Sequence, residues 1–210
     1  MTYRALLFDL DGVLVDSLGL IERILREWAA EHGLDADHAV ALAPGRRDID
    51  LIRLLAPHLD AEAETARIVA REESDVAGLR ALPGAAETLD ALSPASWAIV
   101  TSGTRAVATA RLEAAGLPLP KFLVAAEDVP TGKPDPSGYL KAAALLGRPP
   151  EACLVVEDAP AGAQAARAAG MDCLGVGPAL TTQSSPAIAT APDLAHAPLV
   201  ITPTSITLDL

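Results

Sequence analysis

Two aspartates near the start of the chain have the type and spacing to do chemistry. Asp9 and Asp11 come directly after an apolar run from Tyr3 to Phe8 and just before Gly12. The apolar run is typical of a buried strand, and open parallel sheets bind ligands at the carboxyl ends of their strands. Two carboxylates at such an edge repel each other unless a cation or a shared proton relieves them. The pair therefore indicates a reactive site, although Asp-x-Asp alone is also common in an ordinary turn.

Three further strand ends carry polar residues of complementary types. One offers hydroxyls in a turn, the loop after the next offers a cation, and the last offers two more carboxylates: Thr101, Ser102 and Gly103, then Lys133, then Glu157 and Asp158. Each group alone has an ordinary structural explanation as a capping turn or a solvated surface. Together they supply a nucleophile, a second carboxylate, hydroxyl donors, one cation and oxygen ligands of the kind that Mg²⁺ prefers. A helix beginning at Ser102-Gly103 would also seat phosphate oxygens at its N-terminus. The set predicts phosphoryl transfer with Mg²⁺ as cofactor.

The segments that must position these residues alternate between strand-like and helix-like patterns. This alternation predicts an α/β fold with a parallel sheet. After the first strand, further strands are expected at 97–100, 122–125, 153–156, 172–176 and 199–201. Helices are expected at 85–92, from the turn at 102–103 to 115, at 136–146 and at 160–169. The Ser/Thr/Pro-rich loop that joins the last two strands carries no chemical signal.

One region interrupts this alternation. No strand pattern occurs between Val15 and Leu79; instead Ser17 can cap a first amphipathic helix that ends near Gly33. Two more helices are expected at 48–55 and 61–79. We therefore expect residues 16–81 to form a helical cap domain over the strand ends. Residues 1–15 and 82–210 would form the catalytic core.

Composition limits the partners and the compartment. The formal net charge of −12 argues against nucleic acid and anionic membranes, although not against a small phosphorylated metabolite. No apolar run approaches the roughly 18 residues that cross a bilayer, and no signal-peptide pattern precedes Asp9. We expect a cytoplasmic protein that is a monomer or a weak homodimer, with Cys153 and Cys173 reduced and buried.

Four stretches, in order, resemble the four motifs of the haloacid dehalogenase superfamily. They span almost the whole chain: 8–12 (FDLDG), 101–103 (TSG), 132–136 (GKPDP) and 156–162 (VEDAPAG). The resemblance implies a Rossmann-like parallel-sheet core with a helical cap inserted after the first motif, which agrees with the helical block at 16–81.

The resemblance also implies roles for the motif residues. Asp9 would be the nucleophile that forms an aspartyl phosphate, and Asp11 the general acid and base. The phosphoryl group would be held by Thr101, Ser102, Gly103 and Lys133. Mg²⁺ would be held by Asp9, the backbone carbonyl of Asp11, and Asp158 with help from Glu157.

Departures within the superfamily narrow the activity. Dehalogenases lack the second acid, so Asp11 argues against them. Phosphonoacetaldehyde hydrolases need a cap lysine, whereas the lysines here all lie outside residues 16–81. The stretches 44–47, 97–105 and 128–134 are similar to the sugar-phosphatase branch, which includes 2-deoxyglucose-6-phosphatases and glycerol-3-phosphatases. Because Arg46 and Arg47 lie in the linker between cap helices rather than on a helix face, they are candidates for substrate binding, with simple surface exposure as the alternative.

These observations predict a Mg²⁺-dependent phosphatase that acts on a small phosphorylated sugar or polyol. Two other classes stay open: a sugar phosphomutase with the same cap and core, and a non-catalytic binding protein that keeps the fold. Retention of Asp9, Asp11, Lys133 and Asp158 together weighs against the last.

Overall fold

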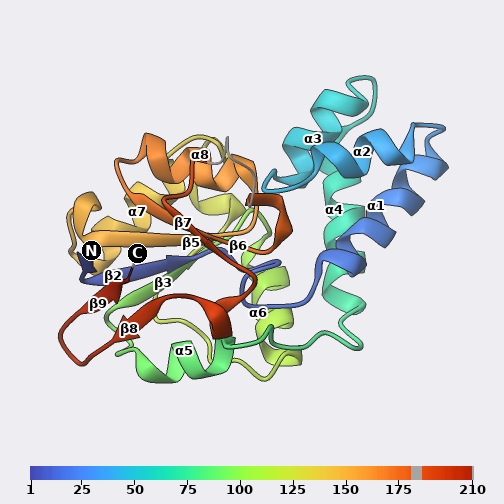
Figure 1. The fold of residues 1–210 in the computed structure, drawn as a ribbon. Coiled ribbons are helices and arrows are strands. Elements are labelled where there is room, and N and C mark those ends of the chain that lie inside the picture. The colour runs from blue at the N-terminus through green and yellow to red at the C-terminus, as the bar shows by residue number, and fades with distance from the viewer. Residues whose placement is uncertain (181–185, 210) are drawn as a thin grey trace.

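A parallel sheet forms the centre of the molecule. The computed structural model describes residues 1–180 and 186–209, and within them six strands pair in the order β4-β3-β2-β5-β6-β7 (Figure 1). Their bounds are β2 (Ala5–Phe8), β3 (Trp97–Val100), β4 (Leu123–Val124), β5 (Cys153–Glu157), β6 (Asp172–Val176) and β7 (Ala189–Ala191). Strand β2 pairs in parallel with both β3 and β5, so the strand that leads to Asp9 lies in the middle of the sheet.

Helices cover both faces of this sheet (Figure 1). Side chains alternate along β2: Leu6 and Phe8 pack in a core cluster with residues of α5 and α6, whereas Ala5 and Leu7 pack with residues of α7 and α8. The four helices are α5 (Ala85–Ala91), α6 (Arg105–Ala114), α7 (Ser137–Leu146) and α8 (Pro160–Ala168). The predicted Rossmann-like α/β class is confirmed.

Four helices between β2 and α5 form a separate block with an apolar core of its own. They are α1 (Leu18–Glu31), α2 (Ala36–Leu42), α3 (Asp48–Leu55) and α4 (Ala61–Ser74). Figure 1 shows the block to one side of the sheet, away from the chain ends. Trp28 of α1, Ile52 of α3 and Ile68 of α4 are buried within it. Helix α2 was not predicted because its seven residues are too few for a clear apolar periodicity.

The two chain segments that join the block to the sheet run side by side. Val15 and Ala81 form an isolated antiparallel bridge, and the Asp16 N–H donates to the carbonyl of Arg80 at 2.9 Å. The side chains of Arg80 and Asp16 also pair at 2.7 Å. The block is thus tied to the sheet at a narrow two-stranded base.

The C-terminal strands differ from the prediction. Residues 199–201 form a strand, β8 (Leu199–Ile201), but it belongs to a second, antiparallel sheet with β1 (Thr2–Tyr3) and β9 (Ile206–Leu208). The last strand of the main sheet, β7, lies inside the predicted Ser/Thr/Pro-rich loop, whose residues 181–185 fall outside the described residues. Strands of three residues are too short to give an alternation signal. No helix in the described ranges is long and apolar enough to cross a membrane.

Candidate active site

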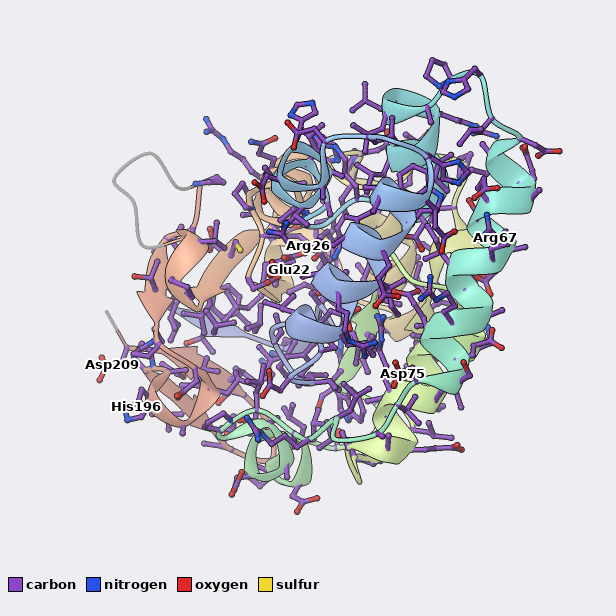
Figure 2. The ribbon with its side chains drawn as sticks, turned by 90° about the vertical axis from the view of Figure 1, so that its right-hand side faces the viewer. Glu22, Arg26, Arg67, Asp75, His196 and Asp209 are labelled. Carbon is purple, nitrogen blue, oxygen red and sulfur yellow. The ribbon has the colours of Figure 1, made fainter. Side chains whose placement is uncertain are left out.

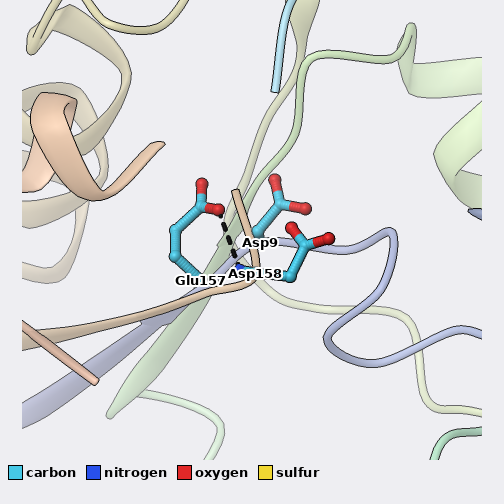
Figure 3. Close-up of side chains that lie close together, drawn as sticks. All are labelled: Asp9, Glu157 and Asp158. Carbon is cyan, nitrogen blue, oxygen red and sulfur yellow. Dashed lines mark hydrogen bonds between the residues drawn. The ribbon is translucent and has the colours of Figure 1, made fainter. Parts of the chain in front are cut away.

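Three carboxylates meet at the carboxyl ends of β2 and β5. Asp9 follows β2, Glu157 ends β5, and Asp158 comes next. Because the two strands are parallel neighbours, their ends share one edge of the sheet. One carboxylate oxygen from each residue lies within 4.8 Å of the others (Figure 3). Three of the four residues predicted as metal ligands are therefore brought together; the fourth, Asp11, would contribute its backbone carbonyl and is not part of this carboxylate group.

The electrostatics of this group favour a bound cation. Burial raises the pKa of Asp9 to about 7, Lys133 opposes the rise, and the charges of Glu157 and Asp11 add to it. Burial, followed by the charges of Glu157 and Asp9, raises the pKa of Asp158 to about 9. Carboxylates that repel one another in a buried site are the donor set that a hard divalent cation satisfies. The residues present fit Mg²⁺.

Two glycines let the backbone approach these carboxylates. Gly12 has φ +75°, and a Cβ there would lie 2.4 Å from Oδ2 of Asp158. A Cβ on Gly162, in α8, would lie 1.6 Å from Oε1 of Glu157. Any larger residue at either position would displace a carboxylate of the site.

Glu157 is fully engaged by protein donors. Its Oε1 accepts from Lys133 Nζ at 2.6 Å and from the Tyr139 hydroxyl at 2.7 Å. Its Oε2 accepts from the backbone N–H groups of Asp158 and Ala159, both at 3.1 Å. Since these four bonds use its acceptor positions, Glu157 is placed to hold Lys133 as much as to assist a metal.

Lys133 connects the nucleophile candidate to Glu157. Its side chain is 5% exposed, and its ammonium donates to Oδ1 of Asp9, to Glu157 and to the Val100 carbonyl at 3.1 Å. Burial lowers the pKa of Lys133, but the charges of Asp9 and Glu157 more than offset it and raise the pKa overall. Lys133 therefore stays positive beside Asp9.

The Thr-Ser-Gly turn after β3 lies at the same edge. Thr101 Oγ1 accepts from the N–H of Gly103 at 3.1 Å, and Ser102 Oγ donates to the carbonyl of Gly45 in the helical block at 2.8 Å. Helix α6 begins at Arg105 with Thr104 as its cap, later than the predicted start at Ser102-Gly103. The hydroxyl of Thr104 caps the helix, so the preceding turn remains a loop.

Asp11 points toward two partners outside the carboxylate group. Its Oδ1 accepts from the Ser17 hydroxyl at 2.5 Å, and its Oδ2 accepts from Arg111 Nη1 at 2.8 Å. Ser17 precedes α1 as predicted, but its side chain makes no capping bond there because it binds Asp11 instead. The second aspartate is thus held by the base of the helical block and by α6.

Arg111 and Glu72 were missed by the sequence analysis. Arg111, in α6, is 2% exposed, and its Nη2 donates to Oε1 of Glu72 in α4 at 2.7 Å. The sequence did contain one indication that Arg111 is buried: it follows Val107 and Ala108 at helical spacing, on the apolar face of the predicted helix. A charged residue on an apolar face is rarely buried without a partner, so the pattern pointed to an ion pair.

The two cap arginines have different surroundings. Arg46 is exposed, donates to the Leu42 carbonyl at 2.5 Å, and lines the cavity described below. Arg47 is 9% exposed and pairs with Asp50 at 2.6 Å, and its Nη1 donates to the Val129 carbonyl at 3.1 Å. Arg47 thereby fastens the start of α3 to the loop that leads to Lys133.

A cavity of about 290 Å³ lies between the helical block and the strand ends. On the sheet side it is lined by Asp9, Asp11 and Asp158, and by the Ser102-Gly103 turn. Asp9, the candidate nucleophile, therefore lines a space large enough for a small organic molecule. The other predicted residues of the four motifs do not line this space but contact residues that do: Thr101 contacts Gly103, Lys133 contacts Asp9, and Glu157 contacts Asp158.

Comparisons with known proteins agree with this geometry. The family model described as haloacid dehalogenase-like hydrolase matches residues 3–170. The chain is 45% identical to hexitol phosphatase A of Escherichia coli over 181 residues, which cover 84% of each chain. It is 35% identical to glycerol-1-phosphate phosphohydrolase 2 of Saccharomyces cerevisiae, over 82% of this chain and 74% of that protein.

Solved structures show the same fold. A hydrolase from Pseudomonas syringae superposes with a TM-score of 0.81 at 28% identity, over 92% of this chain and 95% of that one. CbbY from Rhodobacter sphaeroides, in complex with phosphate, gives a TM-score of 0.80 at 23% identity over the same shares. With four motif segments converging at one sheet edge and relatives matched along most of its length, the chain belongs to the haloacid dehalogenase-like hydrolases.

Proposed function

We propose that the protein is a phosphatase that hydrolyses the phosphate monoester of a small sugar or polyol. The observation that carries the proposal is the placement of Asp9 in the lining of the cavity, where its carboxylate accepts a hydrogen bond from Lys133 and lies within 4.8 Å of the Asp158 carboxylate. The curated relatives named above, a hexitol phosphatase and a glycerol-1-phosphate phosphohydrolase, support the substrate class.

The reaction would proceed in two displacements at phosphorus. An oxygen of Asp9 attacks the phosphorus, the bond to the ester oxygen breaks, and Asp11 gives its proton to that oxygen. Asp11 then takes a proton from water as the water attacks phosphorus, which releases phosphate and restores Asp9. For this role the Asp11 carboxylate would exchange its hydrogen bond from Ser17 for one to the substrate.

Lys133 and the Thr101–Gly103 turn would hold the phosphoryl oxygens. Mg²⁺, held by Asp9, Asp158 and the backbone carbonyl of Asp11 and assisted by Glu157, would neutralise charge between the nucleophile and the phosphate. Lys133, which donates to Asp9, would serve the same end, because two anions approach each other only when their repulsion is reduced.

We also propose that residues 16–81 act as a cap domain over a core of residues 1–15 and 82–210. The separate apolar core of the block and its narrow base at Val15 and Ala81 support this division. Contacts of Gly45 with Ser102, and of Arg47 with Val129, close the block onto the sheet edge. A closed cap excludes water while the aspartyl phosphate forms.

Phosphate release from a panel of metabolite monophosphates tests the proposal. Hexitol, glycerol and sugar phosphates with Mg²⁺ should release inorganic phosphate, and excess chelator should stop the release. Failure of every sugar and polyol phosphate, with turnover of an unrelated ester, would contradict the proposed substrate class.

The phosphomutase alternative is distinguished by its product. Glucose 1-phosphate with a trace of the 1,6-bisphosphate would give glucose 6-phosphate if the protein were a mutase, because the phosphorylated Asp9 would then be attacked by a sugar hydroxyl. Free phosphate from sugar phosphates, without glucose 6-phosphate, is the result we expect.

A further inference from the structure

The helical block contributes carboxylates, as well as apolar side chains, to the cavity above Asp9. Asp48, the first residue of α3, and Glu72 of α4 both line it. Ile21, Leu25 and Val40 supply apolar surface. Glu22 lines it too, but its carboxylate is paired with Arg26 at 2.8 Å, its neighbour on α1 (Figure 2). The wall that faces a leaving group is therefore both apolar and acidic.

Carboxylates outnumber cations among the residues that line the cavity. The lining cations are Arg46, which donates to the Leu42 carbonyl, and Arg111. Arg111 is the cation shared by Asp11 and Glu72, at 2.8 and 2.7 Å. Burial raises the pKa of Asp48, and the positive charge of Arg111 opposes this rise with a smaller effect. Among the described residues, however, the Asp48 carboxylate accepts no hydrogen bond and forms no ion pair. Glu72 is 4% exposed, and within the same residues only one of its two oxygens accepts a bond.

The guanidinium itself is also incompletely satisfied. Arg111 Nε is one of two buried side-chain polar atoms that lack a hydrogen-bond partner within residues 1–180 and 186–209. Buried polar groups are costly without partners, and such exceptions call for an explanation. A ligand with hydroxyl groups, which both donate and accept, explains the unused acceptors on Asp48 and Glu72 and the unused donor on Arg111 beside one cavity.

We propose that Asp48 and Glu72 recognise the leaving group, accepting hydrogen bonds from the hydroxyls of an uncharged polyol or sugar and rejecting one that carries a second anion. This inference rests on the proposed phosphatase function and names its specificity-determining residues. Hydroxyls donate to carboxylates, and the carbon-bound hydrogens of the same chain pack on Ile21, Leu25 and Val40. A second phosphate or a carboxylate would instead face the negative charge of Asp48 in this cavity. Arg111 fixes Glu72 and so positions the wall.

The first experiment compares Asp48→Ala with Asp37→Ala in the full-length protein with Mg²⁺. Both residues are acidic and stand in the first turn of a cap helix, but the side chain of Asp37 is 86% exposed and pairs with Arg26. Steady-state kcat/KM is measured for a hexitol 6-phosphate and for hexyl phosphate, which lacks the hydroxyls. Asp48→Ala should lower the preference for the hexitol ester about 10- to 100-fold, the effect of losing hydrogen bonds to a charged group. Asp37→Ala should leave the preference unchanged.

A second variant separates hydrogen bonding from charge and guards against misfolding of the first. Asp48→Asn keeps an acceptor oxygen of similar shape but removes the charge. It should retain more of the preference for the hexitol ester than Asp48→Ala does. It should also gain relative activity, about tenfold, on a hexitol bisphosphate, since it removes one repulsive charge.

The outcomes are distinguishable. Equal losses on hexitol and hexyl phosphates in both Asp48 variants, with no gain on the bisphosphate, would overturn the assignment while the phosphatase function stands. A wild-type protein that prefers hexyl phosphate or the bisphosphate would overturn it as well. A wild-type protein that releases no phosphate from any polyol or sugar ester would defeat the proposed function and this inference together.

Discussion

Two buried cations, Lys133 and Arg111, each join a catalytic-site aspartate to a glutamate. Lys133 lies between Asp9 and Glu157, and Arg111 lies between Asp11 and Glu72. Their exposed side-chain fractions are similar, at 5% and 2%. They differ in what they connect.

The Lys133 group is built wholly from the core. Asp9 follows β2, Glu157 ends the neighbouring strand β5, and the Tyr139 hydroxyl in α7 adds a further donor to Glu157. The Arg111 group spans the core and the helical block, since Glu72 is in α4. We infer that the two cations have different roles. Lys133 binds the phosphoryl group, and Arg111 positions Asp11 and the cavity wall that contains Glu72.

Removing the first cation should have the largest effect. Lys133→Met leaves Asp9 and Glu157 buried without their positive partner, which costs about 3–5 kcal/mol of stability. Turnover of every substrate should fall by about 10³-fold or more, because the repulsion between Asp9 and phosphate is no longer reduced. Chemical denaturation and phosphate release measure the two effects. Lys141→Met is the control, since Lys141 is 41% exposed and pairs with Asp128 at the surface. Similar small losses of turnover in Lys133→Met and Lys141→Met would show that Lys133 has no role in the reaction.

Loss of the metal should come next. Excess chelator should stop turnover, Mg²⁺ should restore it, and Asp158→Ala should raise the Mg²⁺ concentration at half-maximal activity at least about tenfold. Ca²⁺ should inhibit because its larger, looser coordination shell would misplace Asp9. Titration of the rate with each metal checks these effects. Full activity in the presence of chelator would exclude the cation from the account.

Breaking the second cation should have a smaller and more selective effect. Arg111→Met removes the partner of both Asp11 and Glu72, and we expect kcat to fall about 10- to 100-fold because Asp11 is less well positioned. Arg111→Lys should recover part of kcat, since it keeps the charge but reaches fewer oxygens. The preference for a hexitol ester over hexyl phosphate should fall in Arg111→Met as well. A loss as large as that of Lys133→Met on all substrates would erase the distinction between the two groups.

The smallest effect concerns stability and pH. Burial first, and the charge of Asp48 second, raise the pKa of Glu72 to about 8, with Arg111 opposing. Between pH 4.5, the ordinary pKa of this carboxyl group, and pH 8, the folded protein keeps the Glu72 proton and the unfolded chain releases it. Proton binding therefore stabilises the folded state at low pH, and this contribution to the free energy of unfolding is lost as the pH rises toward 8. Glu72→Gln should narrow the difference in melting temperature between pH 5 and pH 8. Glu62→Gln, whose side chain is 71% exposed on the same helix, should not. An unchanged pH dependence in Glu72→Gln would contradict the burial argument.

The residues around Lys133 could be predicted from the sequence, whereas the pairing of Arg111 could not. Asp9, Glu157 and Asp158 each follow or end a predicted strand within a short motif. Because the ends of parallel strands share one edge of the sheet, the sequence predicted that these residues lie close together. Arg111 lies 100 residues from Asp11 and 39 from Glu72 along the chain, with no motif to join them. Their pairing depends on how α4 packs against α6, which apolar periodicity alone does not determine. Helix α2 and strands β7 and β9 were missed for a different reason, because each is too short to show its period.

The central claim is that Asp9 carries the phosphoryl group between two displacements. Rapid acid quenching of Asp11→Asn with substrate and Mg²⁺, followed by mass spectrometry of the N-terminal peptide, tests it most directly. Asp11→Asn removes both the acid of the first displacement and the base of the second. With an aryl phosphate as substrate, whose leaving group needs no proton, only the second displacement depends on Asp11, so the intermediate should accumulate. We expect one phosphoryl group on Asp9, and neither this adduct nor turnover in Asp9→Asn. A peptide that stays unmodified while wild-type protein releases phosphate, or an Asp9→Asn variant that keeps a tenth of the wild-type rate, would contradict the account.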